Sequence, residues 1–322
     1  MPTVRANGLN IEYVETGDQR APAILLIMGL GMQLIGWPDS FCQSLAERGF
    51  RVVRFDNRDV GRSSKMGGGN AIFLAAAVIR ALRGGRVAAR YTLHDMADDA
   101  IGVMDALGIE RAHVVGASMG GMIGQVIAAE HAERVRSLVS IMSSSGDRRL
   151  PRGNVRALLP VLWPSTPLFG RKRAVQRGMR LFRAIGSPGF PTSDEELRAK
   201  VERAIARSDY RPGVARQMLA IVASGSRVEM LRRIRVPTLV LHGADDPLIP
   251  VAAGEDTANK IPGASLRIIP GMGHDLAPGL VPLLVEAIAE HCQAADRSPD
   301  RKARGDSGGR PGPESRATRS LR

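Results

Sequence analysis

A glycine-rich turn between a buried strand and a helix most strongly constrains how this 322-residue chain can fold. The segment reads HVVGASMGGMIGQ (residues 113–125), in which a β-branched run comes first and helix-like residues follow. Glycine lets two backbone segments approach closely because it has no Cβ. We therefore expect a sharp strand–turn–helix junction with Ser118 at the bend. Gly116 and Gly120 are required there because a Cβ at either position would collide with the adjoining strand or helix.

Strand and helix patterns alternate on both sides of this junction. AILLIM is a continuous apolar run, which is typical of a strand buried on both faces. RVVRF, LVSIM and TLVLH are further strand patterns, and helix patterns separate them. At the N-terminus, TVRA and LNIEYVET flank Asn7-Gly8, a pair that favours a hairpin turn. Thr92, three residues before Asp95, is a typical helix cap. The alternation predicts an α/β fold with a mostly parallel, doubly wound sheet.

The alternation stops near residue 146 and resumes near residue 235, which indicates an insertion. Residues 148–235 are helical in pattern and strongly basic, with 20 Arg or Lys against 6 Asp or Glu. We divide the chain into a first core segment (1–145), a helical cap insertion (146–234) and a second core segment (235–293). Residues 294–322 combine Gly, Pro, Ser and charge with almost nothing apolar, so we predict a disordered basic tail.

Composition excludes several classes of protein. The net charge is +13, but it resides in the insertion and the tail, and only 12 residues are aromatic, which argues against nucleic-acid binding. Cys42 and Cys292 lie far apart and match no metal-site spacing. The N-terminus lacks an apolar signal segment, and no apolar run approaches the roughly 18 residues of a membrane span. We expect a cytoplasmic protein that needs neither a metal nor an organic cofactor.

The residues around Ser118 fit the pattern G-x-S-x-G, in which a strained turn exposes a serine hydroxyl above a sheet. Because a serine hydroxyl is inert at neutral pH, it needs a histidine as base and an acid that orients the histidine. The Met119 N–H lies at a helix N-terminus, where it can stabilise an oxyanion. The loop after AILLIM contains Gly29-Leu30-Gly31 and places the Leu30 N–H as the second donor.

The base and the acid come from the second core segment. His274, in PGMGHD, follows the last predicted strand, where a loop can carry an imidazole over the sheet. The other histidines lie on strands, on helices or within local packing: His94, His113, His131, His242 and His291. Asp246 is the favoured acid because the following proline biases it toward an extended conformation. Asp245 and Asp147 remain alternatives, since each also follows a predicted strand.

Five segments together resemble the α/β-hydrolase superfamily, and more closely its branch of aclacinomycin methylesterase and the mycobacterial lipase/esterases. They are IMGLGMQLIGWPDSF, RVVRFDNRDVGRSS, YTLHDMADDAIGVMDALGIERAHVVGASMGGMIGQVIA, VPTLVLHGADDPLIP and IIPGMGHD. The chain departs from the commoner His-Gly oxyanion pattern, since Met28-Gly29 stands there. The resemblance implies an α/β-hydrolase fold with a helical cap, in which Ser118 is the nucleophile, Asp246 the acid, His274 the base, and Leu30 and Met119 the oxyanion donors.

The expected activity is hydrolysis of a carboxylic ester or thioester through an acyl-enzyme. The same residues would also serve lactone opening, carbon–carbon bond hydrolysis or perhydrolysis, and a non-catalytic ligand-binding protein is the alternative of a different class. We expect a small-molecule substrate with an apolar part. The segments around Trp163 and Phe169 and the segment IFLAAAVIRAL are expected to supply the apolar lining of its pocket. The basic cap face is compatible with anionic substrates or a lipid surface, although a solvated arginine-rich face is the simpler interpretation. Arg58 and Asp59 are expected to form a buried ion pair that fixes their loop.

Overall fold

An eight-stranded sheet forms the centre of the computed structural model, which describes residues 1–67, 80, 85, 87–151, 153–154 and 170–297. Its strand order is β1-β2-β4-β3-β5-β6-β7-β8. β2 pairs antiparallel with β1 and β4, and every other pair of neighbours is parallel, as predicted. The strands are β1 (Thr3–Ala6), β2 (Leu9–Thr16), β3 (Ala23–Ile27), β4 (Arg51–Phe55), β5 (Ala112–Ala117), β6 (Val135–Ile141), β7 (Thr238–Gly243) and β8 (Ser265–Ile269).

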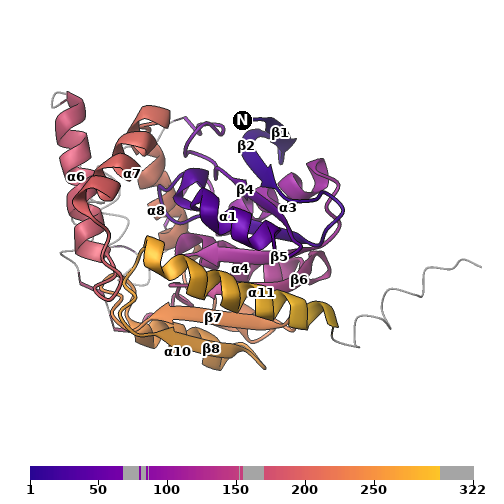
Figure 1. Cartoon of the computed structure of the whole chain (residues 1–322). Helices are drawn as coiled ribbons and strands as arrows, with labels where there is room; N and C mark the ends of the chain where they lie inside the picture. The colour runs from indigo at the N-terminus through magenta and orange to yellow at the C-terminus, as the bar shows by residue number, and fades with distance from the viewer. Residues whose placement is uncertain (68–79, 81–84, 86, 152, 155–169, 298–322) are drawn as a thin grey trace, which may run out of the picture.

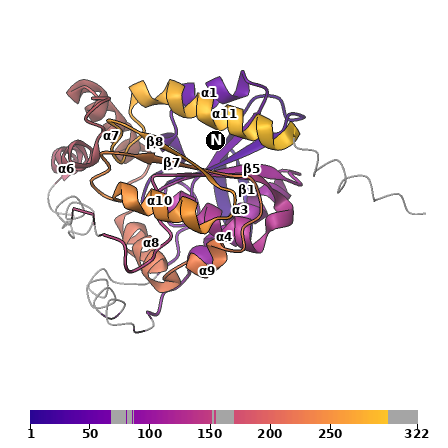
Figure 2. The same ribbon diagram turned by 90° about the horizontal axis from the view of Figure 1, so that it is seen from below.

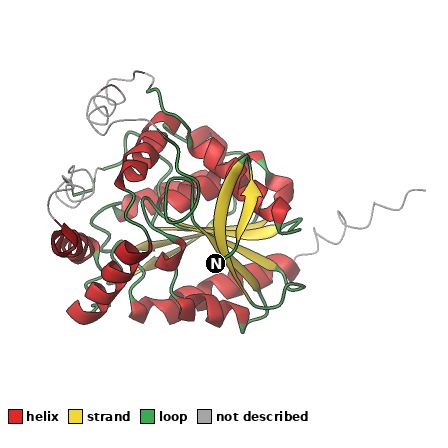
Figure 3. Cartoon of the chain, turned by 90° about the horizontal axis from the view of Figure 1, so that it is seen from above, coloured by secondary structure: helices red, strands yellow, loops and turns green. Residues whose placement is uncertain are grey.

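Helices cover both faces of the twisted sheet (Figures 2 and 3). α1 (Asp39–Ala46) and α11 (Val281–Arg297) pack together on one face. α3 (Leu93–Ala106), α4 (Met119–Glu130) and α10 (Val251–Lys260) lie on the other. Each face has its own apolar core, and β3, β4 and β5 are buried along their whole length between the two. This burial on both faces explains the continuous apolar run of β3.

Local signals in the sequence set the ends of several elements. Asn7 and Gly8 both have positive φ, 46° and 76°, as a two-residue hairpin turn between β1 and β2 requires. The Thr92 side chain accepts a hydrogen bond from the Asp95 N–H, and the Asp95 carboxylate accepts one from the Thr92 N–H, so a capping box starts α3. Both features follow the sequence-based predictions.

The structure describes four helices between β6 and β7: α6 (Gly170–Ile185), α7 (Asp194–Arg207), α8 (Arg211–Ser224) and the short α9 (Val228–Leu231). α6, α7 and α8 gather at one end of the sheet (Figure 1), whereas α9 packs against α4 and α10. α6 and α7 share a small apolar core of Val175, Met179, Leu197 and Val201. We retain residues 146–234 as the proposed extent of the cap, since all four helices fall within it.

The prediction that Arg58 and Asp59 pair with each other is wrong, because each forms a buried ion pair with a different residue. Arg58 donates to both carboxylate oxygens of Asp99 on α3, each at 2.6 Å. Asp59 instead accepts from Arg216 on cap helix α8, at 2.7 and 2.8 Å. Asp59 has a φ of 71°, so the chain turns sharply and the two neighbouring side chains point apart. The second of these buried pairs fixes the cap helix to the core loop.

Two further expectations concern residues at the edge of the described chain. α11 continues to Arg297, past residue 293, because Ala295 is buried and Asp296 contacts Arg136 and His113. The predicted tail therefore cannot begin at residue 294. Residues 298–322, the segments around Trp163 and Phe169, and most of the helix candidate in residues 66–90 lie outside the described residues.

Candidate functional site

The junction between β5 and α4 holds Ser118 in a strained conformation. Ser118 has φ 55° and ψ −116°, a region that side-chain-bearing residues rarely adopt. A Cβ on Gly116 would lie 2.1 Å from the Gly120 carbonyl oxygen, and one on Gly120 would lie 2.0 Å from the Ile27 oxygen of β3. The two glycines therefore let α4 pack directly on the sheet. This packing raises the Ser118 hydroxyl above the carboxyl ends of the strands.

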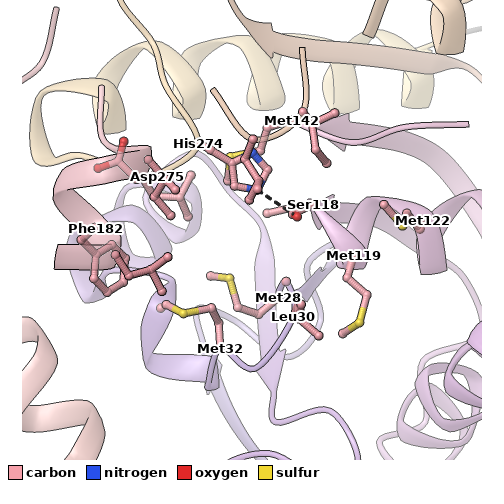
Figure 4. A pocket seen from close by; sticks show the side chains of 18 of the residues that line it. Met28, Leu30, Met32, Ser118, Met119, Met122, Met142, Phe182, His274 and Asp275 are labelled. Carbon is pink, nitrogen blue, oxygen red and sulfur yellow. Dashed lines mark hydrogen bonds between the residues drawn. The ribbon is translucent and has the colours of Figure 1, made fainter. Parts of the chain in front are cut away.

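Two side chains from distant loops form a row of hydrogen bonds with Ser118, in which His274 bonds to Ser118 and Asp246 bonds to His274. The His274 Nε2 lies 2.9 Å from the Ser118 Oγ (dashed line in Figure 4), and the His274 Nδ1 lies 2.7 Å from Asp246 Oδ2. Asp246 Oδ1 accepts hydrogen bonds from the Leu248 and Ile249 N–H groups, both at 2.8 Å. His274 and Asp246 are both buried. The structure thus brings together the three side chains selected from the sequence.

The alternative acids bond elsewhere. Asp245 Oδ2 accepts the Gly271 N–H at 2.8 Å, which ties the loop after β7 to the loop after β8. Asp147 pairs with Arg149 and Lys260. Neither carboxylate hydrogen-bonds to His274 among the described residues, so the geometry favours Asp246.

Four of the other histidines have their partners outside this row. His94 pairs with Glu130, His131 with Asp98, and His113 with Ser137 and Asp296, while His291 contacts the Pro237 oxygen. His242 is buried, and its Nε2 contacts the Ile249 oxygen at 2.8 Å and lies 3.7 Å from Asp246 Oδ2. Burial lowers the pKa of His242, which favours a neutral ring beside the carboxylate.

The expected oxyanion donors flank the serine hydroxyl. Met119 is the first residue of α4, where an N–H has no partner within the helix. On the other side, a Cβ built on Gly29 would lie 3.7 Å from the Ser118 Oγ, so the backbone that leads to Leu30 passes close to the serine. Neither the Leu30 N–H nor the Met119 N–H donates a hydrogen bond to another group of the described residues. The Gly31 N–H donates to Gln217 of α8 at 2.8 Å, which fixes this loop to the cap.

A cavity of about 310 Å³ opens over Ser118 and His274. Its walls are mostly apolar and rich in methionine: Met28, Met32, Met119, Met122, Met142 and Met218. Figure 4 shows Met119 and Met122 on one side of Ser118, with Phe182 and Asp275 on the other. Methionine adapts its shape to neighbouring groups, so these walls suit an apolar ligand of irregular outline.

Besides His274, two ionisable side chains interrupt the apolar lining, namely Lys200 of α7 and Asp275. Burial raises the pKa of the Asp275 carboxyl and lowers the pKa of the Lys200 ammonium. In both cases the reason is that loss of water disfavours the charged form. No three His, Cys, Asp or Glu side chains within the described ranges are arranged to hold a metal ion.

Comparison with known proteins settles the family. The profile of the α/β hydrolase fold family matches residues 22–277, which is most of the chain. The chain belongs to the α/β hydrolase fold family. This α/β hydrolase is 29% identical to a rhodomycin D methylesterase of a Streptomyces species and 28% identical to one of Streptomyces peucetius; each alignment covers 87% of this chain and 93% of the relative. The resemblance to methylesterases inferred from the motifs is confirmed at this level.

Solved structures agree on the fold. The crystal structure of an enol-lactonase from Burkholderia xenovorans superimposes with a TM-score of 0.70 and 23% identity, covering 91% of this hydrolase and all of the lactonase. No described helix of the hydrolase is both long enough and apolar enough to pass through a membrane.

Sequence reasoning about this α/β hydrolase missed the cap residues that complete the site. Lys200 and Phe182 line the cavity, and Arg216 and Gln217 fasten the cap to core loops. Their places depend on how the cap folds back over the sheet, so no local spacing marks them. For Asp275, the only available signal is its position directly after His274.

Proposed function

We propose that this α/β hydrolase cleaves carboxylic esters of small, largely apolar molecules through an acyl-enzyme on Ser118. The row of hydrogen bonds from Asp246 through His274 to Ser118, at the floor of an apolar cavity, is the observation that carries the proposal. The methylesterase names of the Streptomyces relatives support an ester as the substrate.

In the proposed reaction, the Ser118 Oγ attacks the ester carbonyl carbon while His274 Nε2 takes the hydroxyl proton. Negative charge then develops on the carbonyl oxygen, where the Leu30 and Met119 N–H groups stabilise it. His274 returns its proton to the leaving alcohol oxygen, which leaves an acyl group on Ser118. A water molecule, deprotonated by His274, releases the acid and restores the serine.

Asp246 orients His274 in this scheme. Its Oδ2 accepts a hydrogen bond from the Nδ1–H, so Nε2 of the neutral ring is free to act as the base toward Ser118. The carboxylate also stabilises the imidazolium that forms during attack. Two backbone N–H groups bonded to Asp246 Oδ1 hold the carboxylate in place.

Hydrolysis of p-nitrophenyl butyrate tests the proposal. We expect a burst of p-nitrophenol equal to the enzyme concentration, if deacylation is slower than acylation, and a loss of about a millionfold in kcat for Ser118→Ala. Ser265→Ala is the matched control, because Ser265 is exposed on edge strand β8. Equal turnover in wild type and Ser118→Ala would overturn the proposal, and binding without turnover would favour a non-catalytic ligand-binding protein.

Lactone opening, thioester cleavage, carbon–carbon bond hydrolysis and perhydrolysis would use the same three side chains. A panel of these substrates with Ser118→Ala as the blank separates them. We place esters first because both Streptomyces relatives are named as methylesterases.

A further inference from the structure

One end of the cavity carries two opposite charges that do not touch. Figure 4 places Asp275 and Phe182 together on the side of Ser118 away from Met119 and Met122. Lys200 reaches the same end from α7, with its Nζ 4.5 Å from the centre of the Phe182 ring. Lys200 and Asp275 form no ion pair within 4.0 Å of each other.

Neither charge is fully satisfied by the protein. Asp275 is only 8% exposed, and its Oδ1 accepts the Ser187 hydroxyl at 2.5 Å, while Ser187 in turn accepts the Gly273 N–H. The Ser187 N–H also hydrogen-bonds to this carboxylate, which still leaves carboxylate lone pairs without a partner among the described residues. The Lys200 ammonium contacts the face of Phe182 but has no hydrogen-bond acceptor among the described residues.

A purely apolar substrate would fit this end poorly. It would offer no hydrogen bond to the Lys200 ammonium or to the Asp275 carboxylate, and burying charged groups whose hydrogen-bonding capacity is only partly filled is costly. A site with buried hydrogen-bonding groups discriminates strongly against ligands that leave those groups unpaired. The end of the cavity beside Phe182 is therefore suited to a polar group.

We propose that Lys200 and Asp275 form a polar subsite that binds an uncharged group able to accept from Lys200 and donate to Asp275, such as a primary carboxamide. This inference rests on the proposed ester hydrolysis, which it makes more specific. A carboxylate on the substrate would be attracted by Lys200 but repelled by Asp275. An ammonium group would be attracted by Asp275 but repelled by Lys200. A carboxamide presents a carbonyl oxygen to Lys200 and an N–H to Asp275, so it satisfies both.

Matched pairs of esters test the subsite. On the acyl side, p-nitrophenyl succinamate is compared with p-nitrophenyl isocaproate, which has the same shape and no polar terminus. On the alcohol side, the butyrate ester of γ-hydroxybutyramide is compared with isohexyl butyrate. In one of these pairs, wild type should prefer the carboxamide by about 10-fold or more in kcat/KM, as hydrogen bonds to charged groups predict.

Variants assign the preference to its residues. Lys200→Met and Asp275→Asn should each reduce the ratio of kcat/KM between the carboxamide and the apolar ester toward one. Lys172→Met is the matched control, because Lys172 is exposed on α6 and does not line the cavity, and it should keep the wild-type ratio. Hydrolysis of both pairs with no preference, or a preference that survives in Lys200→Met, would overturn the subsite.

Binding separates failure of the subsite from failure of the proposed function. If wild type hydrolyses none of the esters, the proposed function fails, and the subsite is then judged by calorimetry. In a Ser118→Ala background, one carboxamide ester should bind about 10-fold tighter than its apolar match, and adding Lys200→Met should remove the difference. Equal dissociation constants in the Ser118→Ala protein would contradict the inference.

Discussion

Gly120→Ala tests the account of the serine turn. The new Cβ would lie 2.0 Å from the Ile27 carbonyl oxygen, whereas ordinary contacts begin near 3.4 Å, so the two groups must separate by about 1.4 Å. Neither can move easily, because Ile27 lies in β3 opposite Gly116 of β5, and Gly120 lies in the first turn of α4.

The expected cost follows from two opposing terms. Overpacking that shifts the backbone destabilises by up to about 3 kcal/mol, while alanine in a helix gains about 1 kcal/mol over glycine. We therefore expect a net loss of about 2 kcal/mol in the free energy of unfolding. The strain also displaces Ser118 and the Met119 N–H, and a shift of about 1 Å in such groups costs roughly 100-fold in activity.

Urea unfolding and kcat/KM for p-nitrophenyl butyrate measure the two effects. Gly67→Ala is the control, since a Cβ there would have nothing within 4 Å and its φ is not positive. If Gly120→Ala matched Gly67→Ala in both stability and activity, the explanation of the glycine pattern would be refuted.

Three further perturbations follow from the structure. Arg216→Met leaves the fully buried Asp59 without its cation, so unfolding free energy should fall by about 3 kcal/mol in a urea titration, and no loss would show that the pair is dispensable. Asp246→Asn should keep the fold, as judged by circular dichroism, but lower kcat about 10,000-fold; a loss below 10-fold would remove Asp246 from the mechanism. Burial alone would raise the pKa of Asp296, but hydrogen bonds and charge from His113 and Arg136 lower it to about 2. Because the unfolded carboxyl titrates near 3.9, this stabilisation is present above about pH 4 and is lost as the pH falls toward 2. Asp296→Asn should flatten that part of the acid-stability profile, and an unchanged slope would contradict the assignment.

The parts of the site that depend on local chain geometry could be predicted from the sequence. Ser118 is marked by glycines whose spacing fits one strand–turn–helix junction, and His274 by a loop that follows a strand. Since carboxyl ends of parallel strands meet at one edge of a sheet, these loops had to converge. The fold class could also be predicted, because the alternation of buried strands and helices is a local pattern along the chain.

Long-range partners could not be predicted in this way. Asp245 and Asp246 follow the same strand, and only the turn geometry shows that Asp246 reaches His274 while Asp245 bonds to Gly271. The partner of Asp59 lies 157 residues away on a cap helix, so adjacency to Arg58 was misleading. Lys200 likewise reaches the cavity only because the cap folds over the sheet.

Covalent labelling tests the central claim most directly, namely that His274 and Asp246 activate the Ser118 hydroxyl as a nucleophile. The protein is treated with a fluorophosphonate, and the modified peptide is identified by mass spectrometry. We predict one phosphonyl group on Ser118 in wild type, none in Ser118→Ala, and labelling slowed at least 100-fold in His274→Ala. A label on another residue, or equal labelling of wild type and Ser118→Ala, would contradict the account.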